Sequence, residues 1–211
     1  MWLMLLLLTT AGTKATATEW TDVTAKYITN PNFNSSNYNG WTESHNGGGP
    51  IGVSANAMRF YNTTFDFNQQ LTGLPKGTYR LTVQGFYRAN TNSYDAYQNG
   101  TENTTGYLYA GNTATKLASV YSEVMTSQAA GTWQVFDNKY FPDNSSSSAA
   151  AFEAGLYAGN TIEFAAEGTL TIGIRSEENE GGNYCVFDNF KLEYSGELPD
   201  APDPDTEGWV D

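Results

Sequence analysis

The sequence has few of the residues that build common catalytic and metal centres. Cys185 is the only cysteine in 211 residues, so a disulfide within the chain is excluded. His45 is the only histidine and lies in a glycine-rich stretch. This excludes histidine-rich zinc sites and disfavours a Ser-His-Asp or Cys-His catalytic arrangement. Any metal is therefore expected to be a hard cation bound through oxygen atoms.

Positive charge is also scarce. Ten Lys and Arg residues stand against 23 Asp and Glu residues, which gives a formal net charge of −13. Such a field repels phosphate backbones and anionic lipid surfaces, so we expect no nucleic-acid partner. The longest apolar run, MWLMLLLL at residues 1–8, is too short to cross a bilayer, so no membrane insertion is expected.

The two ends of the chain differ in composition from the middle. The apolar run leads to Ala15-Thr16-Ala17, which has the form of a signal-peptidase site. Residues 1–17 are therefore predicted to be a secretory signal, the alternative being an apolar tail, and the protein is expected to be secreted or at the cell surface. Residues 197–211, ELPDAPDPDTEGWVD, contain three prolines and six acids and predict a solvated linker to an adjacent domain.

The domain between these ends, residues 18–196, has the composition of an all-β protein, with 21 glycines in the chain and 14% aromatic residues. Its most informative stretch is residues 74–88. There Tyr79, Leu81 and Val83 alternate with polar residues, and Phe86 is the one apolar residue of the polar row. The pattern predicts a long antiparallel strand with one face in a core and the other nearer water. Residues 65–71 are expected to pair with it as a hairpin through residues 72–77.

Similar alternation predicts further strands along the chain. They are residues 20–28, 58–61, 106–110, 116–121, 132–136, 161–165, 169–175 and 184–194. Serines at 145–148, followed by alanines and Gly155, predict one short capped helix. About eight to ten strands without a βαβ rhythm indicate an all-β, antiparallel β-sandwich.

Aromatic residues in polar loops and at strand ends are candidates for sugar binding. Exposed rings stack on the apolar faces of sugars, and neighbouring amide, guanidinium and carboxylate groups bond the hydroxyls. The predicted ligand-binding residues are Trp41, Tyr87, Arg88, Tyr94, Asp95, Tyr97 and Trp133. The group from Arg88 to Tyr97 is the most site-like, because it follows a strand end. The alternative for each ring is packing in the core or at its rim.

Carboxylates give no catalytic signature. A glycosidase needs two of them roughly 5–10 Å apart, and no spacing in the sequence pairs any two, so no enzymatic activity is predicted. Asp188 is different, since it shares a predicted face with Val186, Phe190 and Leu192, where a carboxylate is costly unless it is paired or metal-bound. Two interpretations stay open: a calcium ligand together with Asn34, or a hydrogen-bonded cap of the first loop.

Five blocks in residues 20–196 resemble a known family. They are ITNPNF…GW, FDFNQQLTGLPKGTYRLTVQGFYR, AFEAGLYAG, GTLTIGIRS and CVFDNFKLEY. Together they resemble the galactose-binding-like jelly-roll domains and carbohydrate-binding modules of secreted polysaccharide-degrading proteins from Bacteroidetes-type bacteria. The resemblance implies a jelly roll and a structural Ca²⁺ at Asn34 and Asp188, with Asn34 standing where an acid is usual. It also implies a sugar site on the concave sheet or in loops at one edge.

These observations predict a non-catalytic carbohydrate-binding module. It would bind a plant cell-wall polysaccharide, xylan or β-glucan, and hold an attached catalytic domain near its substrate by raising its effective concentration. One alternative is a structural spacer or protein-interaction sandwich without a sugar site, which predicts buried aromatics and no groove with two exposed rings. The other is a small glycosidase or lyase with a carboxylate pair in a cleft.

Overall fold

The computed structural model describes residues 19–128 and 131–196, so the predicted signal (1–17) and linker (197–211) lie outside the described residues. Within these ranges every pairing of named strands is antiparallel, which confirms the all-β antiparallel class. The described part has three short helices instead of the single one predicted: α1 (Thr24–Tyr27), α2 (Tyr94–Gln98) and α3 (Ser145–Glu153). None of them is long and apolar enough to span a membrane.

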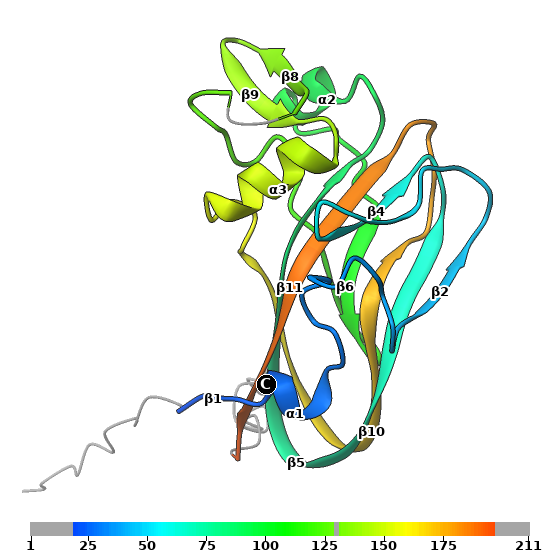
Figure 1. Cartoon of the computed structure of the whole chain (residues 1–211), viewed down its shortest axis with the longest axis vertical. Coiled ribbons are helices and arrows are strands. Elements are labelled where there is room, and N and C mark those ends of the chain that lie inside the picture. Colours follow the sequence, from blue (N-terminus) through cyan, green and yellow to red (C-terminus); the bar gives the residue numbers. More distant parts are fainter. Residues whose placement is uncertain (1–18, 129–130, 197–211) are drawn as a thin grey trace, which may run out of the picture.

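Two very long strands form the backbone of the fold. β5 (Phe65–Arg88) pairs with β10 (Asn160–Ser176) from Phe65 opposite Ser176 to Val83 opposite Asn160. This ribbon bends back on itself near residues 73–77 and Gly168, where the register shifts (Figure 1). The predicted hairpin through residues 72–77 is therefore wrong. The turn residues bend the strand, but both halves of β5 bond to β10 and not to each other.

The bend places the two halves of the ribbon in opposite layers of a sandwich. One layer contains the first half of β5, the second half of β10, β2 (Thr42–His45), β6 (Gly106–Ala110) and β7 (Thr113–Lys116). The other contains the remaining halves with β11 (Tyr184–Ser195), β4 (Ala57–Tyr61), β3 (Gly52–Ser54) and the short β1 (Thr21–Asp22). Rings from both layers meet between them: Phe67 and Phe187 have centroids 5.4 Å apart. The predicted sandwich is thus confirmed.

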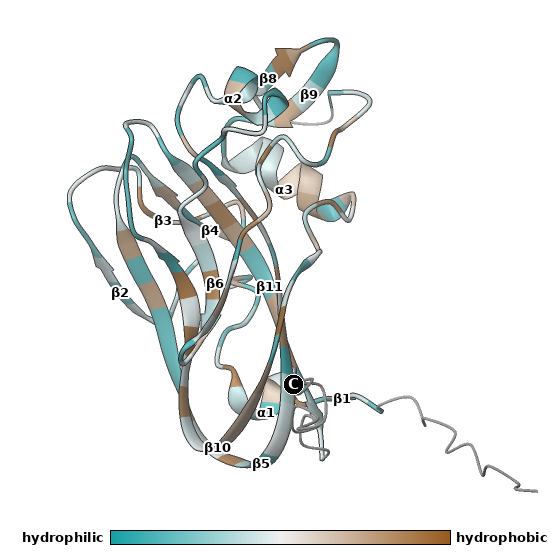
Figure 2. Ribbon diagram, turned by 180° about the vertical axis from the view of Figure 1, so that it is seen from behind, coloured by the Kyte–Doolittle hydropathy of each residue, from teal (hydrophilic) through white to brown (hydrophobic). Residues whose placement is uncertain are grey.

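A second core covers the outer face of the layer formed by β4, β11 and β5. It is closed by a cap, which we define as α2, the 117–125 loop, β8 (Trp133–Phe136), β9 (Lys139–Pro142) and α3. Phe86, the exception in the polar row of β5, packs here with its ring centroid 5.0 Å from that of Tyr157. This end of the row is therefore buried and not near water as predicted. Figures 1 and 2 show the cap lying at this end of the sheet.

Asn160 joins the cap to the ribbon. Its Nδ2 donates to the Gly85 carbonyl at 2.8 Å, and its Oδ1 accepts from the Ala118 amide at 2.7 Å. The side chain is buried, so these bonds satisfy polar groups that water cannot reach. The strand predicted at 116–121 is wrong, since β7 covers Thr113–Lys116 and residues 117–121 belong to the cap, where Ala118 bonds to Asn160.

β11 contributes to both cores because it contains a bulge. Its pairing with β5 shifts between Asp188 and Lys191, and Asn189 has φ 54°. Val186 therefore faces the cap, whereas Leu192 faces the inner core. The single face predicted for alternate residues of 184–194 is wrong, since one extra residue in a strand exchanges its two faces.

At the other pole of the sandwich, the first and last described strands lie side by side. β1 pairs with the end of β11, with Thr21 opposite Tyr194 and Asp22 opposite Glu193. The strand predicted at residues 20–28 is only two residues long, because α1 follows it directly. Figure 1 shows this pole at the bottom and the cap at the top.

The second core predicts a large difference between two positions on one face of β5. Phe86→Ala should lower the free energy of unfolding by roughly 3–5 kcal/mol, because a fully buried ring is lost. Thr82→Ala, on the same face but beyond the cap, should lower the free energy of unfolding by less than about 1 kcal/mol. Urea unfolding followed by tyrosine and tryptophan fluorescence measures both. Equal, small losses would contradict a packed second core.

Candidate functional site

A hollow lies where the cap meets the outer face of β4 and β11, and we call it the arginine pocket. Its volume is about 330 Å³. Two tyrosine rings, two guanidinium groups and several smaller polar groups line it: Tyr61, Tyr184, Arg59, Arg88, Thr91, Gln134, Asp143 and Asn144. Such a mixture of aromatic surface and convergent polar groups is typical of small-ligand sites.

Arg88, the last residue of β5, is buried in the floor of the pocket with 3% of its surface exposed. Its Nη1 donates to Asp143 Oδ1 at 2.6 Å, and its guanidinium lies 5.4 Å from the ring centroid of Tyr184. Its Nε is buried and has no hydrogen-bond partner among the described residues. The ion pair therefore leaves part of this guanidinium unsatisfied.

Arg59 and Tyr61 reach the pocket from β4. Alternation along this strand sends Met58 and Phe60 into the inner core and its neighbours Arg59 and Tyr61 toward the cap. Arg59 Nη1 donates to Ser145 Oγ at 2.9 Å at the start of α3. Its Nε is buried and has no described partner.

Tyr184 stands opposite Tyr61 in the β4–β11 ladder. The two rings meet edge to face, with centroids 6.2 Å apart. Burial raises the pKa of the Tyr184 hydroxyl, while the hydroxyls of Ser148 and Ser145 and the positive charges of Arg59 and Arg88 lower it. The net shift is upward, so this hydroxyl stays protonated at neutral pH.

The structure places two of the predicted sugar-stacking residues in the inner core. Trp41 stacks on Phe67 with centroids 4.9 Å apart, and its Nε1 donates to the Thr29 carbonyl. Tyr87 is 1% exposed, and its hydroxyl bonds to Thr105. Neither ring has a free face, so burial removes both from the set of rings on which a sugar could stack.

The remaining predicted residues belong to the cap, apart from Arg88. Tyr94 stacks on Phe136 at 4.4 Å and is buried, and Trp133 is buried in the same cluster. Tyr97 is half-buried, and Asp95 is exposed on α2. The predicted group of Arg88 with the α2 residues does not assemble around the pocket, because α2 turns its rings into the cap core while Arg88 contacts Asp143. Among the predicted residues, Arg88 alone lines the pocket.

Sequence reasoning missed the polar residues that line the pocket together with Arg88. Arg59, Gln134 and Asp143 come from three separate segments that the fold brings together. The available signal was the short stretch MRFY at residues 58–61, where an arginine and a tyrosine alternate with core residues.

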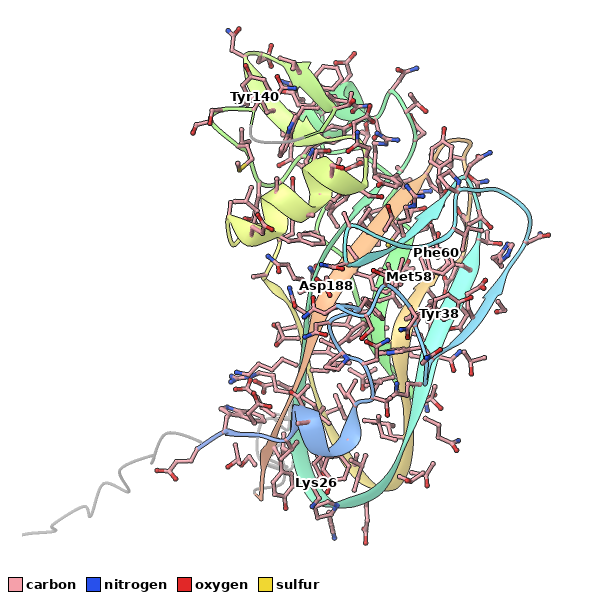
Figure 3. The ribbon with its side chains drawn as sticks, in the orientation of Figure 1. Lys26, Tyr38, Met58, Phe60, Tyr140 and Asp188 are labelled. Atoms are coloured by element: carbon pink, nitrogen blue, oxygen red, sulfur yellow. The ribbon has the colours of Figure 1, made fainter. Side chains whose placement is uncertain are left out.

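A second hollow of about 210 Å³ surrounds Asp188, and we call it the Asp188 hollow. Asn34, Asn56, Glu153 and Asn189 also line it, so the structure brings Asn34 and Asp188 to the same place (Figure 3 labels Asp188, midway along β11). The Asp188 carboxylate is 8% exposed and accepts a bond from the Asn189 amide at 2.8 Å. Burial raises its pKa to about 7, and the Asn189 bond opposes this shift.

The side chains that line this hollow carry oxygen atoms of the kinds that bind a hard cation. Asp188 and Glu153 offer carboxylate oxygens, and Asn34 and Asn56 offer amide oxygens, which are ligands that Ca²⁺ takes. No group of three or more His, Cys, Asp or Glu residues gathers for a metal anywhere in the described part of the chain. Asp188 also caps its own bulge through Asn189, so both interpretations of this residue stay open.

No family model and no curated protein matches the sequence. Among solved structures, that of TmCBM61 in complex with β-1,4-galactotriose is similar to this chain. The two share 13% sequence identity with a TM-score of 0.44, over 80% of this chain and 98% of that one. A likeness at this level carries no statement about the ligand of this chain.

Asp188 predicts a specific pH dependence of stability in the presence of a chelator. Its pKa in the folded protein, about 7, lies above the ordinary value of 3.8, so the folded protein holds the proton more tightly than the unfolded chain. Ionisation of this group therefore favours unfolding, and the loss of stability grows from about pH 4 to pH 7, up to roughly 4 kcal/mol.

The measurement is the free energy of unfolding of the wild-type protein and of Asp188→Asn at intervals from pH 4 to pH 8. Because the variant cannot ionise at position 188, its free energy of unfolding should rise relative to that of the wild-type protein as pH rises. A difference between the two that stays constant over this range would contradict the raised pKa.

Proposed function

We propose that this chain is a non-catalytic carbohydrate-binding module whose sugar occupies the arginine pocket. The observation that carries the proposal is the convergence of two tyrosine rings with guanidinium, amide and carboxylate groups in one hollow. Sugar hydroxyls need donors and acceptors in fixed positions, and the apolar face of a sugar ring needs an aromatic surface. The pocket combines both.

The pocket favours a chain end or a short side branch over a long stretch of polysaccharide. Its volume is near the lower end of the roughly 300–1,000 Å³ usual for small-ligand sites. Tyr184 is buried, with 4% of its surface exposed, so the half-buried Tyr61 supplies most of the aromatic surface that a sugar could reach. Binding would depend more on hydrogen bonds than on stacking.

Binding is favoured over hydrolysis by the carboxylates of the pocket. A glycosidase needs two carboxyl groups on either side of the scissile bond. Asp143 is the one carboxylate among the described lining residues, and it is held in an ion pair with Arg88. We therefore infer that the module binds a sugar without cleaving it. The proposed ligand is a plant cell-wall glycan, xylan or β-glucan, at the cell surface or outside it. By binding this glycan, the module would keep an attached enzyme near its substrate.

One observation favours a different function. Trp41, Tyr87, Tyr94 and Trp133 are buried, as expected for a spacer or protein-interaction domain without a sugar site. The two functions differ in what they require of the arginine pocket, because a spacer needs no ligand there.

Affinity electrophoresis on the soluble glycans and pull-down on the insoluble ones separate these functions, using xylan, β-glucans, mannan, pectin and cellulose, with reducing-sugar release followed in the same samples. We expect retention on at least one glycan without sugar release. Tyr61→Ala and Gln134→Ala should weaken this retention at least fivefold, since each removes a lining side chain. Tyr38→Ala, which removes an exposed ring outside the pocket, should not.

Absence of retention on every glycan would favour the spacer. Sugar release would instead indicate an enzyme, and equal losses for Tyr38→Ala and Tyr61→Ala would place the sugar elsewhere.

We also propose that the Asp188 hollow binds a structural Ca²⁺. The support is its set of carboxylate and amide oxygens and the burial of Asp188. Ca²⁺ at 100 times its Kd should stabilise the protein by about 2.7 kcal/mol, and chelation should reverse this. Thermal unfolding measures the effect. Asp188→Asn should abolish it, while Glu163→Gln, an exposed site on β10, should keep it. Equal responses in both variants would contradict the site.

A further inference from the structure

Arg59 differs from the other arginines in having no counter-charge. Arg80 lies 2.7 Å from Glu193, Arg88 lies 2.6 Å from Asp143, and Arg175 lies 2.8 Å from Glu177. No described carboxylate lies within ion-pair distance of Arg59, although the chain has 23 acids for ten bases. Arg59 donates a hydrogen bond to the Ser145 hydroxyl and lines the arginine pocket.

An unpaired, half-buried guanidinium is unfavourable unless something compensates its charge. In this chain the strand ladder holds Arg59 in place, because its backbone pairs with Gly52 on one side and Val186 on the other. Nearby, the Nε of Arg88 also lacks a partner among the described residues. Two guanidinium groups with buried, unsatisfied Nε donors therefore line the same 330 Å³ hollow, whose described lining has a single carboxylate, Asp143.

We propose that the arginine pocket recognises the carboxylate of a uronic acid residue, with Arg59 as its main counter-charge. This rests on the proposed function, since it names the class of sugar that the same pocket takes. A carboxylate is planar and matches the fork of a guanidinium group, so one or two N–H donors bond its oxygens. Gln134 and Asp143 then face the hydroxyls of the sugar, and Tyr61 faces its ring.

The net charge of −13 restricts this ligand further. A glycan made wholly of uronic acids meets a repulsive field over its whole length. A single carboxylate inside the pocket interacts with two arginines at close range, while more distant charges are screened beyond about 10 Å at moderate salt. The favoured ligand is therefore a largely neutral glycan with isolated uronic acid residues, such as a xylan with uronic acid side branches.

The test compares sugars that differ only at the acid group. Methyl glucuronide and methyl galacturonide are titrated into the wild-type protein by calorimetry or NMR, beside their methyl esters and the neutral methyl glucoside and methyl galactoside. We expect one uronide to bind at least tenfold more tightly than its ester and its neutral counterpart, with an advantage that shrinks as salt is added. This comparison needs no variant and is independent of folding.

Variants then assign the effect to Arg59. Arg59→Gln should lose at least tenfold in affinity for the uronide and leave the neutral sugar within twofold, and Arg59→Lys should be intermediate because it keeps the charge without the fork. Arg175→Gln, a paired arginine outside the pocket, is the matched control and should bind as the wild-type protein does.

The outcomes separate the two proposals. If the neutral sugar or the ester binds as well as the uronide, the carboxylate assignment is overturned while the sugar site stands. If no sugar in the set binds and no glycan is retained, the proposed function fails and this inference fails with it.

Discussion

The hydrogen-bonded ribbon of β5 and β10 is the constraint on which the rest of the molecule depends. Each strand supplies backbone partners to the other on both sides of the bend, so the chain passes from one layer to the other while the two strands stay paired. The bend brings two apolar faces together and creates the inner core. Every other strand of the sandwich adds to one edge of this ribbon or extends a strand that does.

The same ribbon determines where the arginine pocket forms. The second half of β5 is apolar on its inner face, and its outer face carries Phe86 and Arg88 near its end. The apolar ring of Phe86 would be exposed on this face, and rings of the second core pack over it. Arg88 lies two residues further along the same face. It is buried at the edge of the cap, where it pairs with Asp143. The pocket is thus the rim of the second core, where apolar packing gives way to charged and hydroxyl groups.

Sequence patterns predicted the parts of this structure that depend on neighbouring residues. Alternation located the strands because it reflects which residues face a core. The strand predicted at residues 106–110 has the same bounds as β6. The predicted hairpin failed because Pro75 and Gly77 indicate only a change of direction, whereas the true partner, β10, lies about 90 residues away. The rings of Tyr94, in a predicted loop, and Trp133, at the end of a predicted strand, were expected to be exposed, and the cap, a long-range assembly, buries them. The bulge at Asn189 is likewise invisible to a pattern that assumes regular strands.

The pairing of β1 with the end of β11 determines where the two ends of the described domain lie. The chain enters and leaves the described domain at one pole, whereas the arginine pocket opens beside the cap at the start of β11. A strand of this length covers roughly 35 Å. The two ends of the described domain therefore lie at the opposite end of the sandwich from the arginine pocket, so a molecule bound in the pocket would not meet them.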